Sequence, residues 1–176
     1  MTSKLAYAFS FILLTILTGC AFPTTKSSAR IDINQLGVVA VMPFDGYNGA
    51  QFADATAQEL LFRGVRLVDR QKLMDIISEQ GMSANSITNG GGFSKIGGLA
   101  GVDHIVSGSV SPIIVYESGA PSGKVSNASL KIVSVKTGEI LVISKYNANT
   151  ELLNGSVLYP EAARRLIASI LPEARK

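Results

Sequence analysis

Hydrophobic residues in this chain form short runs and spaced faces that predict alternating strands and helices. A continuous apolar run over residues 37–44 predicts a strand that is covered on both faces. A stretch rich in Ala, Leu, Gln and Glu over 50–64 predicts a helix that ends at its final glycine. Residues 65–69 predict a second short strand, and Asp69 is positioned to cap a helix over 70–81. The first half of the domain therefore has the order β-α-β-α.

Polar loops interrupt the middle of the chain. Residues 82–93, rich in Asn, Ser and Gly, predict a loop, and a short helix over 94–101 is expected to follow it. A strand is expected over 102–110, and the apolar run after Pro112 extends or redirects that strand. Residues 119–127, with two glycines and a proline, predict a second loop.

The last third of the chain predicts a β-hairpin followed by a helix. Apolar runs over 128–135 and 139–146 flank the turn Lys136-Thr137-Gly138, in which the glycine is expected to have a positive φ. Pro160 begins an amphipathic helix. The expected fold is an α/β sandwich, with a mixed sheet of about five strands and the order β-α-β-α-(α)-β-β-β-α. The apolar face of the last helix consists of Ala163, Leu166, Ile167, Ile170 and Leu171.

The N-terminus has the three-part pattern of an export signal. Lys4 precedes an apolar run over 5–16, which is too short to cross a bilayer as a helix, since that requires ~20 residues. The sequence Leu-Thr-Gly-Cys ends this segment and resembles a bacterial lipobox. That resemblance implies cleavage after Gly19 and acylation of Cys20. The alternative, an incidental buried cysteine, is disfavoured because a thiol directly after such a run has no core around it.

We therefore divide the chain into three parts: a lipoprotein signal peptide over 1–19, a lipidated flexible tether over 20–35 and a single domain over 36–176. The tether is expected to be flexible because its side chains are short and polar. Ala21, rather than Asp, follows the cysteine, which by the sorting rule of such lipoproteins indicates the outer membrane.

Composition and charge exclude several classes of protein. The chain has 176 residues, of which 47% are hydrophobic and 16% charged, as expected for one compact domain. A net charge of +3, scattered along the chain, gives no indication of nucleic-acid binding. Cys20 is the only cysteine, so an internal disulfide is impossible, and no cofactor or metal site is expected.

Two glycine-rich motifs fail as catalytic or phosphate-binding loops. The segment 89–98, NGGGFSKIGG, lacks the spacing of a P-loop, because Lys95 follows Ser94 rather than a glycine. The same segment lacks the second glycine of a nucleophile elbow. His104 is the only histidine, and its neighbour Asp103 would point to the opposite face of a strand, so His104 is expected to be either a surface residue or a structural histidine.

The carboxylates and arginines also have structural explanations. Asp69 is expected to cap a helix, Glu79 to end one and Glu139 to lie in the hairpin. Arg164 and Arg165 form a small basic patch, interpreted as a solvated helix face, with contact to an acidic partner as the alternative. No catalytic residues are assigned, and the protein is not expected to be an enzyme.

Several ordered stretches together resemble the CsgG-type curli secretion lipoproteins. They are VAVMPF (39–44), LVDRQKL (67–73), EQG (79–81), GGLAGVDHIVSGSV (97–110), IIVYESG (113–119) and SLKIVSVKTGEIL (129–141). Related folds occur in LpoB-like activators of penicillin-binding proteins, FlgO-like flagellar lipoproteins and the N-terminal domain of TolB. The resemblance implies a non-catalytic α/β domain on the periplasmic side of the outer membrane. In the curli proteins this domain forms a ring, and each subunit contributes two β-hairpins to a membrane pore.

The connections that would form those hairpins are short here. Segments 119–127 and 147–159 cannot each supply two membrane strands of ~9–11 residues. The leading hypothesis is therefore a lipid-anchored adaptor or scaffold in envelope assembly or secretion. Alternatives are a subunit of a CsgG-like secretion channel, an LpoB-like activator or a FlgO-like flagellar lipoprotein. Expected partners are the membrane, through Cys20, an envelope protein of unknown identity and further copies of the chain.

Overall fold

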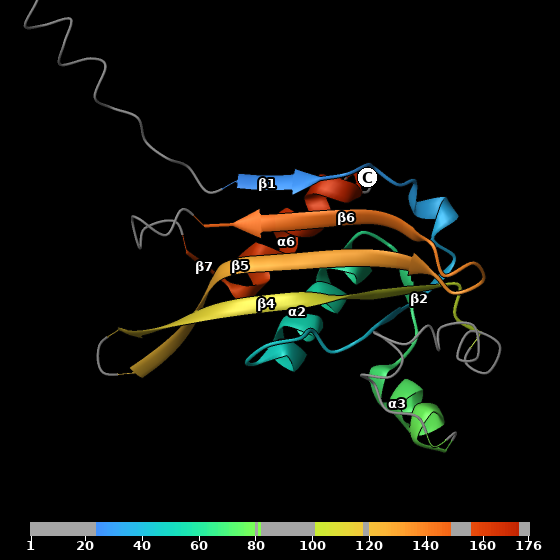
Figure 1. Ribbon diagram of the computed structural model, residues 1–176, viewed down its shortest axis with the longest axis horizontal. Helices are drawn as coiled ribbons and strands as arrows, with labels where there is room; N and C mark the ends of the chain where they lie inside the picture. The colour runs from blue at the N-terminus through green and yellow to red at the C-terminus, as the bar shows by residue number, and fades with distance from the viewer. Residues whose placement is uncertain (1–23, 80, 82–100, 118–119, 149–155, 173–176) are drawn as a thin grey trace, which may run out of the picture.

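The computed structural model describes residues 24–79, 81, 101–117, 120–148 and 156–172 (Figure 1). The strands are β1 (Thr24–Ser27), β2 (Val38–Val41), β3 (Arg66–Leu67), β4 (His104–Glu117), β5 (Ala120–Ser134), β6 (Ile140–Asn147) and β7 (Val157–Leu158). The helices are η1 (Ile33–Gln35), α2 (Gly49–Phe62), α3 (Arg70–Glu79) and α6 (Tyr159–Ile170).

The strands form one mixed sheet of seven strands in the order β1-β6-β5-β4-β2-β3, with β7 paired to β5. β2 runs parallel to both β3 and β4, and the β4–β5, β5–β6 and β1–β6 pairs are antiparallel. The predicted mixed sheet with helices packed on it is thus confirmed. β1 and β7 are the strands that the sequence pattern did not predict.

Helices α2 and α6 cover one face of the sheet. Figure 1 shows α6 behind β5 and β6. The alternation of side chains along the strands sends Val106, Leu130 and Tyr146 into the core beneath these helices. The predicted apolar face of α6 is confirmed, because Ala163, Leu166, Ile167, Ile170 and Leu171 are all buried.

Helix α3 covers only one end of the opposite face. Leu73 and Ile77 pack there on a smaller core cluster that includes Ile105 and Val133. Asp69 caps this helix as predicted, since its Oδ1 accepts a hydrogen bond of 2.9 Å from the Lys72 backbone N–H. The rest of this face is not covered by α3 and carries mainly polar residues.

The tether prediction is wrong for residues 24–35. Thr24–Ser27 forms β1 and pairs with β6, and the Ile31 N–H donates to the Ile170 carbonyl at 2.8 Å. η1 follows, and Leu36 is buried. The side chains of β1 are polar, so the hydrophobic pattern gives no sign of a strand there. The strand forms because its backbone makes hydrogen bonds to the otherwise open edge of β6.

The second predicted loop, 119–127, is also wrong. β5 begins at Ala120 and pairs with β4 continuously from Glu117↔Ala120, with one register shift at Ser111/Pro112. The predicted extension of β4 beyond Pro112 is confirmed. Pairing along β4 overrides the weak strand preference of Gly and Pro in this segment. The predicted loop 82–93 and nearly all of the predicted helix 94–101 lie outside the described residues.

Candidate functional surfaces

Cys20, the predicted lipidation site, lies outside the described residues. The domain begins close to it, because β1 starts at Thr24. Four residues of extended chain reach at most about 14 Å. A lipid on Cys20 would therefore hold the start of β1 within about 14 Å of the membrane. The predicted flexible tether would instead allow a separation of about 50 Å. Figure 1 shows that the paired ends of β4 and β5 project from this same end of the sheet.

Helix α6 carries a cluster of charges around Glu161. The Arg164 Nε and Nη2 donate to this carboxylate at 2.7 and 2.8 Å, and the Arg165 Nε donates to it at 2.7 Å. The hydrogen bond from Arg164 contributes most to lowering the pKa of Glu161 to about 2, and Arg165 adds to the shift against the opposing effect of burial. The Arg165 guanidinium lies 5.8 Å from the centre of the Tyr146 ring, while burial raises the pKa of the Tyr146 hydroxyl.

This arrangement changes the interpretation of the predicted basic patch. Arg164 and Arg165 share one carboxylate from the first turn of the same helix, at spacings of three and four residues. Their positive charge is therefore partly neutralised within α6. The pairing of Glu161 with these arginines is not among the predictions above, although the spacing of three and four residues could have indicated it.

His104 has the predicted structural role. Its Nδ1 lies 2.6 Å from the Leu36 carbonyl oxygen, and its neighbour Asp103 accepts a hydrogen bond of 2.7 Å from the Val38 N–H. Both side chains thus fix the backbone around β2 rather than each other. In the part of the chain that the structure describes, no three His, Cys, Asp or Glu side chains gather as a metal site. Ser94 and Lys95 lie outside the described residues.

A hollow of about 480 Å³ lies between α2 and the start of α3. Arg70 crosses its rim, with an ion pair of 2.9 Å to Asp54 and a hydrogen bond of 3.1 Å to the Ala50 carbonyl. Leu61 lines the hollow with 57% of its surface exposed, and the neighbouring Phe62 is 72% exposed. Exposed apolar side chains beside an ion pair are typical of protein contact surfaces.

Comparison with known families gives a match over most of the domain. A family model described as curli production assembly/transport component CsgG matches residues 44–157, more than half of the chain. The chain belongs to the CsgG family. Membership gives it an envelope or secretion-related role and agrees with the resemblance found in the sequence. Comparison with curated proteins gives no match.

Several solved structures are similar to this chain at low sequence identity. A PelC dodecamer from Paraburkholderia phytofirmans is 12% identical, with a TM-score of 0.51 over 88% of this chain and 100% of that chain. Lipoprotein GNA1162 from Neisseria meningitidis is 21% identical, with a TM-score of 0.47 over 67% of this chain and 90% of that chain. The LpoB C-terminal domain from Escherichia coli is 19% identical, with a TM-score of 0.46 over 65% and 90%. At 12% identity the likeness to PelC establishes the fold alone.

Among the described residues, no helix is both long enough and apolar enough to cross a membrane.

Proposed function

We propose that this CsgG-family protein is an outer-membrane lipoprotein that faces the periplasm and acts as a non-enzymatic adaptor in envelope assembly or secretion. The observation that carries the proposal is the lipobox, Leu-Thr-Gly-Cys20, placed only four residues before the first strand of a CsgG-family domain. Acylation of Cys20 supplies the membrane anchor, and Ala21 directs the chain to the outer membrane.

The side chains that are most capable of acid–base chemistry support a binding role rather than catalysis. His104, Asp103 and Asp69 each make a hydrogen bond to nearby backbone. Glu161 is engaged by two arginines, which lower its pKa and keep it ionised, so it is poorly suited to general-base work near neutral pH. These roles stabilise the domain and leave its surfaces to recognise partners.

Protein contact is assigned to the surface around the hollow between α2 and α3. Leu61 and Phe62 expose apolar area that a second protein surface would remove from water. PelC, which has the same fold, forms a dodecamer and so supports self-association, which we place at this exposed apolar surface. Sedimentation of the detergent-solubilised chain tests this: L61S/F62S should lower the mass of the assembly, whereas K72S, on α3, should not.

The anchor is tested by Cys20→Ser. This variant should remain an unprocessed precursor and lose its stable acyl-mediated attachment to the outer membrane, because the acylated residue is absent. Ser3→Ala, upstream of the apolar run, is the matched control and should be processed normally. Fractionation combined with mass measurement gives the answer. A wild-type mature chain that carries no acyl mass, yet stays in the outer-membrane fraction, would contradict the proposal.

A further inference from the structure

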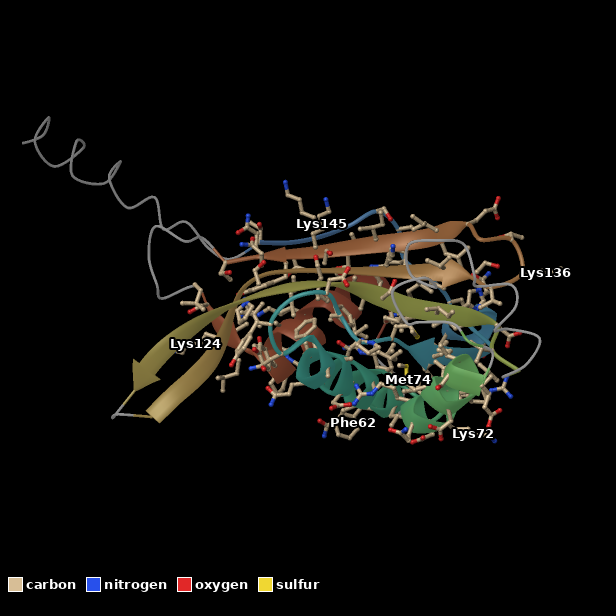
Figure 2. All side chains as sticks on the ribbon, turned by 60° about the horizontal axis from the view of Figure 1, so that its bottom comes forward. Phe62, Lys72, Met74, Lys124, Lys136 and Lys145 are labelled. Carbon is tan, nitrogen blue, oxygen red and sulfur yellow. The ribbon has the colours of Figure 1, made fainter. Side chains whose placement is uncertain are left out.

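One row of residues crosses the sheet on the face away from α2 and α6. Lys26 on β1 pairs with Lys145 on β6, Lys145 pairs with Ser129 on β5, and Ser129 pairs with Ser109 on β4. Their sequence neighbours, such as Tyr146, are buried on the opposite face, so this row faces outward beyond the end covered by α3. Figure 2 shows Lys145 pointing away from the side on which Phe62 projects.

The row carries two positive charges on adjacent strands. Lys26 and Lys145 are both exposed and lie directly opposite each other on adjacent strands, an arrangement of like charges that lowers sheet stability. Lys131 lies on the same face of β5, two residues beyond Ser129. Within the described residues, the ion pairs involve none of these lysines. An anionic partner would relieve the repulsion between them.

A hollow of about 290 Å³ lies on the same face and is lined by Lys131, Lys145 and three serines. The hydroxyls of Ser109 and Ser129 lie 2.8 Å apart. The third serine, Ser107, is only 2% exposed, and its Oγ has no hydrogen-bond partner in the part of the chain that the structure describes. A buried hydroxyl without a partner is costly unless a bound group satisfies it.

The donors around this hollow suit phosphate oxygens. Ammonium groups and hydroxyls both donate hydrogen bonds, and those from a charged donor to a charged acceptor are the stronger ones. One carboxylate, Asp45, also lines the hollow and pairs with Ser109, three strand positions from Lys145. Strands spaced about 4.8 Å apart place the Asp45 backbone roughly 14 Å from that of Lys145. The end of the hollow beside Lys145 is therefore the part that suits a bound anion.

Chain length keeps this face close to the predicted lipid anchor. Lys26 follows Cys20 by six residues, which reach about 21 Å at most. This step rests on the proposed acylation of Cys20. This reach allows the lysines to come within about a Debye length of the bilayer, ~8 Å at physiological salt, where anionic lipids attract them.

We propose that Lys26, Lys145, Lys131 and the serines beside them, the lysine face, bind the phosphate groups of anionic phospholipids. The domain then lies against the membrane that holds Cys20, rather than swinging freely from its lipid. Such binding fixes the orientation in which the surface around Leu61 and Phe62 and the projecting ends of β4 and β5 meet their partners. It also accounts for a row of like charges that the fold alone leaves repelling.

Lysine footprinting on the full chain, isolated from membranes and reconstituted in vesicles, tests the proposal. Vesicles of phosphatidylcholine alone are compared with vesicles containing phosphatidylglycerol, and acetylation at each lysine is followed by mass spectrometry. Lys26, Lys131 and Lys145 should react roughly threefold more slowly, or slower still, in the anionic vesicles, and high salt should remove the difference. Lys72 and Lys136, on α3 and the β5–β6 turn (Figure 2), are internal controls and should not change.

Two variants sharpen the test. K26E/K145E should remain attached to vesicles through Cys20, but Lys131 should lose its protection from acetylation in the anionic vesicles. K72E/K136E is the matched control and should behave as wild type. Equal reactivity of the three lysines in both kinds of vesicle, with the chain still attached, would overturn the lysine face and leave the anchor intact. Protection by soluble phosphate or polyphosphate, but not by vesicles, would also overturn it. Failure of the anchor is recognised separately, by the absence of acyl mass and of flotation with phosphatidylcholine vesicles.

Discussion

At the scale of single residues, Glu161 combines three favourable interactions. It lies in the first turn of α6, where a negative charge is stabilised by the helix dipole, and it accepts hydrogen bonds from Arg164 and Arg165. Its folded-state pKa of about 2 is below the ordinary value of 4.5, so the unfolded chain binds a proton more readily. Its contribution to stability is therefore complete above pH 4.5 and is lost as the pH falls towards 2.

Glu161→Gln should consequently lower the free energy of unfolding near neutral pH by about 1 kcal/mol, a modest value because the partners are partly exposed to solvent. The difference from wild type should shrink between pH 4.5 and 2. Denaturant unfolding of the solubilised chain at a series of pH values measures it. A constant difference across this range would mean that the two arginines do not hold the carboxylate in its ionised form.

Gly138 is a second residue whose role is local. The predicted positive φ is confirmed at +75°, and a Cβ atom added there would meet no other atom within 4 Å. Gly138→Val should therefore destabilise the domain through backbone strain alone, by ~1–2 kcal/mol. Gly138→Asn should cost clearly less, because Asn adopts this conformation more readily. Equal melting temperatures for the two variants would show that the turn does not need a left-handed residue.

At the scale of elements, α3 depends on its cap. Among the described contacts, Asp69 is the only side chain that accepts a hydrogen bond from a backbone N–H of the first turn of α3, whereas Asp75 accepts one from the Gln71 side chain on the exposed surface. Asp69→Ala should destabilise α3 by about 1 kcal/mol, and hydrogen exchange of the α3 amides should accelerate. Asp75→Ala is the matched control, with an expected cost of ~0.3 kcal/mol. Similar exchange in both variants would rule out a special role for the cap.

Some strands have a hydrophobic pattern that predicts them, and others form only because a neighbouring strand pairs with them. β2, β6 and the inner part of β5 are apolar runs with buried residues, and the sequence predicts each of them. β1 and the outer part of β5 contain polar residues, Gly or Pro, and they become strands because β6 and β4 present unpaired backbone groups. No local pattern reveals such a strand, since its stabilising bonds are to residues far along the chain.

At the scale of the whole molecule, the projecting hairpin bears on the question of a membrane pore. Beyond the register shift, β4 and β5 are paired from Pro112↔Val125 to Glu117↔Ala120. These six pairs extend about 20 Å, less than the ~30 Å hydrocarbon layer. The connection from Asn147 to Val157 is also shorter than the ~20 residues that a pair of membrane strands requires.

The purified protein, alone in a planar bilayer, should therefore form no stable channels, because backbone groups left unpaired in lipid cost several kcal/mol each. Oligomers on the membrane surface are compatible with this expectation. Conductance is the measurement, with a variant deleted for 114–123 as the control for any hairpin-dependent signal. Reproducible single-channel steps that disappear in the deletion variant would move the assignment from adaptor to exporter.

Local patterns in the sequence are enough to predict helix α3 with its Asp69 cap, the apolar face of α6, the buried strands, the turn at Gly138 and the likeness to the CsgG family. It also predicted the structural role of His104, because a single histidine beside an aspartate in a strand has no catalytic partner. The prediction of acylation at Cys20 comes from sequence alone as well.

Tertiary structure decided which polar segments become ordered and which charges share a face. Lys26 was assigned to a tether, and only the pairing of β1 with β6 brings it opposite Lys145, more than a hundred residues later. The same pairing shortens the reach from Cys20 to the domain. The physical reason is that hydrogen bonds between strands and the side-chain alternation they impose are set by register between distant segments, which no window of neighbouring residues contains.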